Sequence, residues 1–299
     1  MRCAERPKGD EVSAQAAARP LGLGDLAAKK EAGEPIVMVT AYDHPSAQIA
    51  EEAGVDMVLV GDSAAMTVLG YDSTVPVTID EMLMLTRAVR RGLSRPLLVG
   101  DLPFGSYEAS DSLAVQTAQR FVKEAGCDLV KIERGGTTVD RARAIVAAGI
   151  PVVGHVGLTP QSVTALGGYR AQGRTAEAAL AVIDDALALQ EAGCVLIVVE
   201  AVPSEVTALL VERLRIPVIG IGAGADADGQ VLVWHDLLGI YDGPAAKFVK
   251  RYADVRAASV VGVSEYAREV RSGEYPAPEH GYGMPADEAA RLKELLAGR

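Results

Sequence analysis

One short phrase recurs along the chain and restricts what it can fold into. A helix-like segment ends in Ala-Gly, an apolar run follows, and an acidic residue closes the run, as in EEAGVDMVLVGDS (51–63), KEAGCDLVKIE (123–133) and QEAGCVLIVVE (190–200). A glycine just past a helix can take the left-handed conformation that closes it. Each phrase therefore predicts a helix that ends at its glycine, followed by a buried strand.

Eight strands are predicted, most of them rich in β-branched residues and bounded by Gly, Pro or Asp. They cover residues 35–40, 56–60, 96–100, 128–132, 151–156, 195–199, 217–221 and, on a weaker pattern that is short and basic, 246–251. Apolar residues at helical spacing predict amphipathic helices at residues 79–91, 111–125, 139–148, 176–192, 205–214 and 255–270.

Strands that are almost wholly apolar are buried on both faces, as in parallel sheets covered by helices. Eight such strands alternating with helices over roughly 250 residues match an α/β fold, the (β/α)8 TIM barrel, as a single domain. An open, doubly wound sheet is the alternative, although no GxGxxG follows the first strand. The barrel is predicted to span residues 21–280, after a disordered leader (1–20) and before a tail with a short helix (281–299).

Composition argues against several classes of protein. The net charge of −11 disfavours a nucleic-acid surface, and no apolar run approaches the roughly 20 residues of a membrane span. Three cysteines without a CxxC pair are too few for a disulfide framework, and Cys127 and Cys194 are interpreted as small buried hydrophobes. Since the leader lacks an apolar core, the prediction is a cytoplasmic protein that binds neither nucleic acid nor membranes.

Ionisable residues gather where the predicted strands end, which is where barrels build their active sites. Asp62, Asp101 and Glu133 come from three successive strands, and three ionised carboxylates brought together need a cation. Oxygen ligands without cysteine favour Mg²⁺ over Zn²⁺. These residues are therefore interpreted as a magnesium site, while a lone aspartate in such a place is usually a helix cap or a solvated loop residue.

Three more residues at strand ends suggest chemistry. Lys131 shares a strand face with Glu133, and an inward lysine needs an anion such as a substrate carboxylate, unless the two form a pair on the rim. Glu200 ends an apolar strand, and apolar surroundings raise the proton affinity of a carboxylate and suit a general base, unless a rim cation pairs with it. His155 either orients a substrate or forms hydrogen bonds in the core.

Long motifs, all in one order, resemble the ketopantoate hydroxymethyltransferase family. They run from about residue 22 to His280 and are VTAYDHPSAQIAEEAGVDMVLVGDS, VLGYDSTVPVT, DLPFGSY, VKIERGG, GHVGLTPQSV, GGYRAQGR, VVEAVPSE and GIGAGADADGQVLVWHD. Two details depart from the family pattern. Arg134 stands where the family continues with Gly-Gly, and Ala64-Ala65 replace Leu-Gly after Asp62-Ser63.

The resemblance implies a (β/α)8 barrel, commonly a decamer, in the synthesis of pantothenate and coenzyme A. The implied reaction moves a hydroxymethyl group from 5,10-methylenetetrahydrofolate to 3-methyl-2-oxobutanoate through a Mg²⁺-bound enolate and gives 2-dehydropantoate. Asp62 and Asp101 would ligate one Mg²⁺ per subunit, with Glu133 in the same cluster. Residues implied to lie at the keto acid are Asp62, Ser63, Asp101, Lys131 and His155, and Glu200 would be the base.

Two other functions remain possible at this stage. One is a Mg²⁺-dependent C–C lyase or phosphonomutase of the isocitrate lyase kind, although such proteins generally carry a Lys-Lys-Cys-Gly-His segment that this chain lacks. The other is a barrel that binds a metabolite without catalysis. The presence of Glu200 and of all three carboxylates argues against that second alternative.

Overall fold

The computed structural model describes residues 19–243 and 246–299. Most of the predicted leader lies outside the described residues. The chain divides into two compact units, one reaching to Leu237 and including Gly243–Lys250, the other formed by Leu238–Asp242 and Arg251–Arg299. The predicted boundaries of the leader, the barrel and the tail stay predictions.

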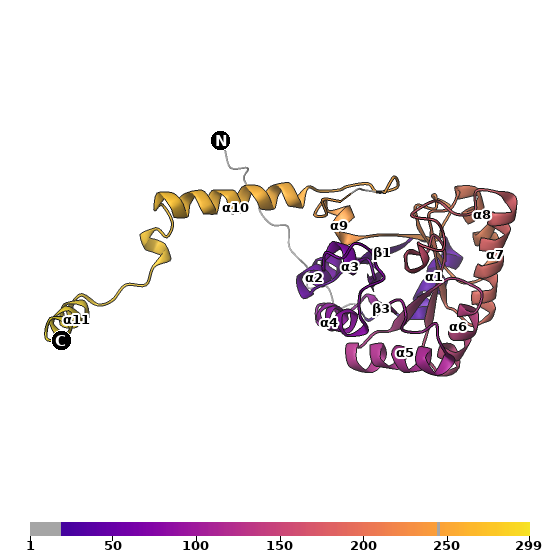
Figure 1. Ribbon diagram of the computed structural model, residues 1–299, viewed down its shortest axis with the longest axis horizontal. Helices are drawn as coiled ribbons and strands as arrows, with labels where there is room; N and C mark the ends of the chain where they lie inside the picture. The colour runs from indigo at the N-terminus through magenta and orange to yellow at the C-terminus, as the bar shows by residue number, and fades with distance from the viewer. Residues whose placement is uncertain (1–18, 244–245) are drawn as a thin grey trace. The chain divides into compact units, whose positions relative to one another are not determined.

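The first unit is a closed barrel of eight parallel strands (Figure 1). Each strand pairs with the next one in the chain, and β8 closes the ring by pairing with β1 through four residue pairs, from Ile36 with Gly229 to Val39 with Leu232. The predicted (β/α)8 fold is therefore confirmed, and the open sheet is excluded. The strands are β1 Ile36–Thr40, β2 Met57–Val60, β3 Leu97–Asp101, β4 Leu129–Glu133, β5 Val152–Gly157, β6 Leu196–Glu200, β7 Val218–Ile221 and β8 Gly229–Leu232.

Helices fill most of the connections between the strands. The first unit contains α1 Leu23–Ala32, α2 His44–Glu52, α3 Ala64–Thr67, α4 Ile79–Arg90, α5 Asp111–Ala125, α6 Thr138–Ala147, the 3-10 turn η1 Pro160–Ser162, α7 Ala176–Glu191, α8 Ser204–Arg213 and α9 Trp234–Leu237. The glycines of the recurring phrase do close helices, since Gly54, Gly126 and Gly193 have φ values of 75°, 71° and 100°.

The predicted eighth strand at residues 246–251 is wrong. That segment is turn and irregular chain, and the strand lies earlier, at Gly229–Leu232. Within that segment Phe248 packs against the barrel core, and it sits so close to Gly222 that a Cβ on Gly222 would clash with its ring. The sequence GQVL was overlooked because it is short and contains a glycine and an exposed glutamine.

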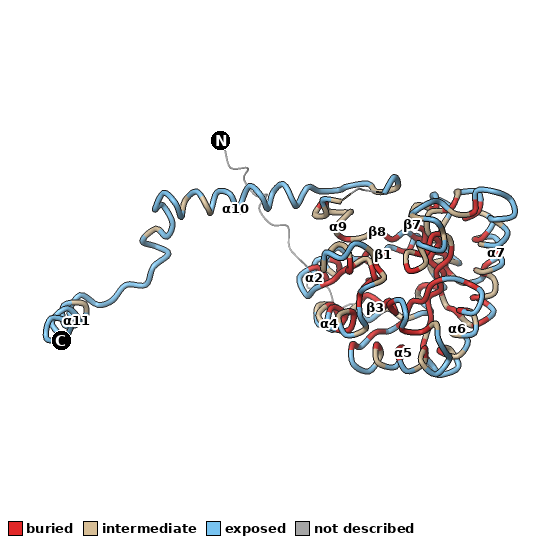
Figure 2. The backbone as a smooth tube through the Cα atoms, viewed as in Figure 1, coloured by how far each residue is buried: buried red, intermediate tan, exposed pale blue. Residues whose placement is uncertain are grey.

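Inside the barrel, alternate residues of each strand point to the axis, and their character changes along the strand. Leu97 and Val99 precede Asp101 on β3, while Leu196 and Val198 precede Glu200 on β6. The apolar members belong to one buried cluster at the barrel interior, and the buried residues gather on the strands in Figure 2. Cys127 and Cys194 are buried as predicted, and burial raises the pKa of the Cys194 thiol to about 12.

The second unit is helical. It contains α10 Val255–Ser272, the 3-10 turn η2 Pro278–His280 and α11 Ala286–Ala297, the short helix predicted in the tail. Neither long helix has a buried residue, and Val260, Val261 and Val263 on α10 are each more than half exposed (Figure 2). Among the described residues, no helix is both long and apolar enough to cross a membrane.

Candidate active site

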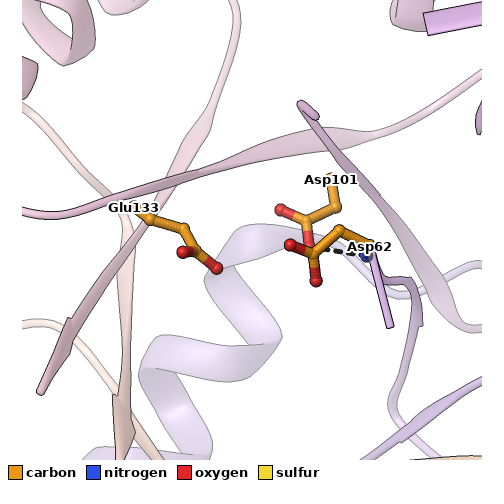
Figure 3. Close-up of side chains that lie close together, drawn as sticks. All are labelled: Asp62, Asp101 and Glu133. Carbon is orange, nitrogen blue, oxygen red and sulfur yellow. Dashed lines mark hydrogen bonds between the residues drawn. The ribbon is translucent and has the colours of Figure 1, made fainter. Parts of the chain in front are cut away.

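The three carboxylates predicted to meet do so at the carboxyl end of the barrel (Figure 3). Asp101 and Glu133 are the last residues of β3 and β4, and Asp62 lies two residues beyond β2. One oxygen from each carboxylate lies within 4.8 Å of the others, and all three residues are buried. The backbone N–H of Asp62 donates to Asp101 Oδ2 at 3.0 Å, and this hydrogen bond holds Asp62 and Asp101 together.

Lys131 lies inside the barrel, as its spacing from Glu133 predicted. Its Nζ donates to both oxygens of Asp101 at 2.8 Å and to Glu133 Oε1 at 3.0 Å. Burial alone would lower the pKa of this ammonium group, but the carboxylates of Asp101, Glu133 and Asp62 outweigh burial and raise it well above its usual value. The lysine is therefore charged and offsets part of the negative charge of the cluster.

His155 connects this cluster to Glu200. Its Nδ1 lies 3.0 Å from Glu133 Oε1, and its Nε2 lies 3.4 Å from Glu200 Oε2. Burial would lower the imidazole pKa, but the Glu133 carboxylate raises it to about 9, so the ring carries a positive charge at neutral pH. The pKa of Glu133 falls to about 2, because Lys131 and His155 together overcome the effect of burial.

Asp62 is the member of the cluster whose charge is least compensated. Burial, together with the nearby charges of Asp101 and Glu133, raises its pKa well above the usual value. Its Oδ2 is buried without a hydrogen-bond partner among the described residues. A hard divalent cation with oxygen ligands would satisfy this oxygen and lower the repulsion, so the residues present fit Mg²⁺.

Backbone geometry brings Glu200 close to the β5 end of the site. Gly157 has a φ of 92°, and a Cβ on it would lie 2.3 Å from the carbonyl oxygen of Glu200. The same carbonyl accepts a hydrogen bond from the N–H of Leu158 at 2.8 Å. Only a glycine allows this approach. The Glu200 side chain is 15% exposed, more than any other ionisable group of the cluster, so it faces the opening of the barrel.

Two neutral residues that the sequence did not single out support Glu133. Tyr107 accepts a hydrogen bond from the N–H of Glu133 at 3.2 Å and donates to Gln161 Oε1 at 2.8 Å. The backbone N–H of Gln161 in turn donates to Glu133 Oε2 at 3.2 Å. Both residues stand inside quoted motifs, DLPFGSY and GLTPQS, but nothing in an uncharged residue type indicated that it would reach the cluster.

Ser63 lies half-buried beside Asp62, and its hydroxyl is 2.7 Å from that of Tyr42. Tyr42 lies two residues beyond the end of β1. The glycines of GIGAG allow close packing, since Gly222 lies against Phe248 and Gly224 against Ser204. These contacts explain why glycine is needed at those two positions.

The loop after β4 contains the residue that departs from the family pattern. Arg134 has a φ of 78°, in the left-handed region that favours glycine. Its N–H donates to the carbonyl oxygen of His155 at 2.8 Å, so the departure does not displace the loop from β5. Lys131 and Glu133 keep the positions expected of them.

A family model described as ketopantoate hydroxymethyltransferase matches residues 21–278. The 3-methyl-2-oxobutanoate hydroxymethyltransferase of Oleidesulfovibrio alaskensis is 50% identical over 287 residues, which are 96% of this chain and 99% of that protein. The protein of the same name from Geobacillus kaustophilus is 52% identical over 263 residues, 88% of this chain and 94% of its own.

Solved structures of other proteins share the fold at much lower identity. A phosphoenolpyruvate phosphomutase from Streptomyces platensis aligns with a TM-score of 0.56 at 16% identity, over 92% of this chain and 96% of that one. A 2,3-dimethylmalate lyase aligns with a TM-score of 0.54 at 15% identity, over 92% and 98%. These likenesses speak for the barrel alone, whereas the family match rests on sequence over most of the chain. The chain belongs to the ketopantoate hydroxymethyltransferase family.

Proposed function

We propose that this chain transfers a hydroxymethyl group from 5,10-methylenetetrahydrofolate to 3-methyl-2-oxobutanoate and forms 2-dehydropantoate. Family membership supports the reaction. The observation that carries it is the buried cluster of Asp62, Asp101 and Glu133, which is linked through His155 to Glu200 at the same end of the barrel. A group that could hold a metal ion and a candidate base therefore lie at the same end of the barrel.

Asp62 and Asp101, with Glu133 beside them, are proposed to hold one Mg²⁺ per subunit. When bound, the ion would act as a Lewis acid that draws electron density from the ketone of the substrate. Ser63 and Lys131 are proposed to contact the keto acid together with the two aspartates, and His155 to lie near it. Lys131 and His155 both carry positive charge beside the site, which favours an anionic substrate.

Glu200 is proposed to remove the proton from C3, next to the ketone. The carbanion, delocalised as an enolate, then attacks the methylene carbon of the folate, and water releases the product and tetrahydrofolate. The general-base role suits the position of Glu200, because its carboxylate is partly exposed at the opening, with His155 Nε2 3.4 Å from one of its oxygens.

The direct test is to incubate the protein with Mg²⁺, 3-methyl-2-oxobutanoate and 5,10-methylenetetrahydrofolate and to follow the product by mass. The expected result is 2-dehydropantoate, formed only when all three are present. Failure to form it, combined with cleavage of 2-methylisocitrate or conversion of phosphoenolpyruvate, would instead favour the lyase or phosphonomutase alternative. Keto-acid binding without any turnover would favour the non-catalytic alternative.

Oligomerisation and location also remain proposals. We propose a homo-oligomer, with the family's decamer as the expected state, in the cytoplasm. The exposed valines of α10 support self-association, since apolar side chains clustered on a surface commonly mark interfaces. Light scattering coupled to size-exclusion chromatography is expected to give the mass of ten chains, and a monomeric mass would contradict the proposal.

A further inference from the structure

We propose that the segment from Tyr169 to Arg174, together with Phe104, binds the folate cosubstrate at the opening of the barrel. This inference rests on the function proposed above and assigns residues to its second substrate. A reduced folate offers a flat pterin, an aminobenzoyl ring and a glutamate with two carboxylates. Its site therefore needs exposed aromatic faces, a cationic group and a place next to the reacting carbon.

Exposed aromatic side chains are confined to one end of the barrel unit. Among its described residues, the aromatic side chains that are more than a third exposed are Tyr71, Phe104 and Tyr169. Each stands in a connection between the carboxyl end of one strand and the long helix that precedes the next strand, on the same side as the carboxylate cluster. Tyr71 has a structural role, because its hydroxyl donates to Glu81 at the start of α4. Phe104 and Tyr169 are the more exposed of the three, at 47% and 53%, so part of each side chain is open to a ligand.

The segment around Tyr169 reaches both halves of the proposed reaction site. The Tyr169 hydroxyl lies 3.8 Å from Met66 Sδ, on the short helix α3 that follows Asp62 and Ser63. Three residues later, the N–H of Gln172 donates to the carbonyl oxygen of Ala201, next to Glu200, at 2.9 Å. The segment thus runs from the metal-binding side to the base, where the donor of the one-carbon unit must be held.

Phe104 lies on the loop after β3, three residues beyond Asp101, and is 47% exposed. The two loops are joined near their bases, since Gln161 Nε2 donates to the carbonyl oxygen of Leu102 at 3.0 Å. Pro103 precedes the ring and Gly105, with a φ of 82°, follows it. A phenylalanine held in such a turn and exposed to water offers a ring face for stacking at little entropic cost.

Positive charge is concentrated on the same segment. In the loops that follow β1 to β7, the basic residues are Arg134, Arg170 and Arg174. Arg134 lies beside Asp185, which it influences electrostatically. Arg170 and Arg174 are exposed, and neither has an ion-pair partner among the residues that the structure describes. In a chain with a net charge of −11, two unpaired guanidinium groups beside an exposed ring suit the glutamate carboxylates of a folate.

Steady-state kinetics with varied folate test the ring. Tyr169→Ala should raise the KM for 5,10-methylenetetrahydrofolate about tenfold, while the KM for the keto acid stays within about twofold of the wild type. Tyr169→Phe keeps the ring and should keep the folate KM. Phe104→Ala should act in the same direction as Tyr169→Ala. An unchanged folate KM in both alanine variants would overturn the assignment.

A change of ligand tests the arginines. For the wild type, 5,10-methylenetetrahydropteroate, which lacks the glutamate, should have a KM about fivefold above that of the folate. The double variant Arg170→Ala, Arg174→Ala should show equal KM values for the two donors, because the carboxylates no longer have partners. The control is Arg91→Ala, an exposed arginine without an ion pair after α4, which should keep the difference. Retention of the difference in the double variant would contradict the role of the arginines.

Binding of tetrahydrofolate measured by calorimetry separates this inference from the proposed function. If the wild type makes no 2-dehydropantoate, the proposed function fails. If the wild type makes the product but Tyr169→Ala and the double arginine variant bind tetrahydrofolate as tightly as the wild type, the site assignment fails while the function stands. Weaker binding in both variants, with unchanged thermal unfolding, supports the assignment.

Discussion

The two ends of the barrel interior are buried alike and are built from opposite chemistry. Toward the amino ends of the strands the inward side chains are apolar, among them Met57, Leu97 and Leu129. Toward the carboxyl ends the inward side chains are ionisable, and Asp101, Lys131 and Glu133 are still buried, at no more than 3% exposed. Burial of apolar groups stabilises the fold, while burial of charge costs free energy unless partners compensate it. The apolar end therefore stabilises the fold, whereas the ionisable end is the one suited to catalysis.

The largest effect is expected at Glu200. Glu200→Gln should keep the fold and lose proton exchange at C3 of 3-methyl-2-oxobutanoate by about 100-fold or more, because an amide cannot accept the proton. Exchange is measured by nuclear magnetic resonance in deuterium oxide with Mg²⁺ present. Glu212→Gln, at an exposed glutamate on α8, is the control and should exchange at the wild-type rate. Wild-type exchange in Glu200→Gln would remove this residue as the base.

A pair of substitutions on β4 compares the two ends directly. Leu129 and Lys131 point to the same interior, two residues apart, and each can be replaced by methionine. Lys131→Met leaves buried carboxylates without their main cation and should lower the free energy of unfolding by about 3–5 kcal/mol in the absence of divalent ions. Leu129→Met changes only shape and should cost less than about 1.5 kcal/mol.

Urea unfolding of both variants gives the comparison. Mg²⁺ should restore part of the stability of Lys131→Met, because the ion replaces the missing positive charge, and should do nothing specific for Leu129→Met. Equal losses of unfolding free energy in the two variants would mean that the polar and apolar ends of β4 contribute to stability in the same way.

A smaller effect is expected at Arg134, in the loop after β4, because its positive φ strains the backbone at the carboxyl end of the barrel. Arg134→Gly should raise the free energy of unfolding by about 1 kcal/mol, because glycine adopts a φ of 78° without the steric cost that an L-residue pays. Arg134→Ala is the matched control. It also removes the side chain but keeps the Cβ, so it should not gain stability. Equal stability of the glycine and alanine variants would show that the backbone there is not strained.

The sequence predicted the barrel well because its signals were local. Apolar runs bounded by Gly, Pro or Asp marked seven strands to within one residue, and the alternation of side chains placed Lys131 and Glu133 on one face. The eighth strand was misplaced because β8 carries little apolar signal, while the short, basic segment that contains Phe248 packs without forming a strand.

Of the candidate site, the sequence predicted the charged residues but not the neutral ones. Carboxylates at strand ends are conspicuous, since burying them needs a reason. Tyr107 and Gln161 are not, because their hydrogen bonds to Glu133 depend on how the loops after β3 and β5 fold over the barrel. Nothing in the sequence singled out Tyr169 or Arg170 either. Their proposed role in folate binding depends on their exposure and on their neighbours in the structure.

Asp62, Asp101 and Glu133 are expected to hold a divalent cation together, and this can be measured by calorimetric titration with Mg²⁺ in the presence of keto acid. The wild type should bind one ion per chain, and Asp101→Asn should weaken that binding by at least about tenfold. Asp226→Asn, at an exposed aspartate between β7 and β8, should bind like the wild type. Unchanged Mg²⁺ affinity in Asp101→Asn would remove Asp101 from the metal site, and no binding by the wild type would rule out the site as a whole.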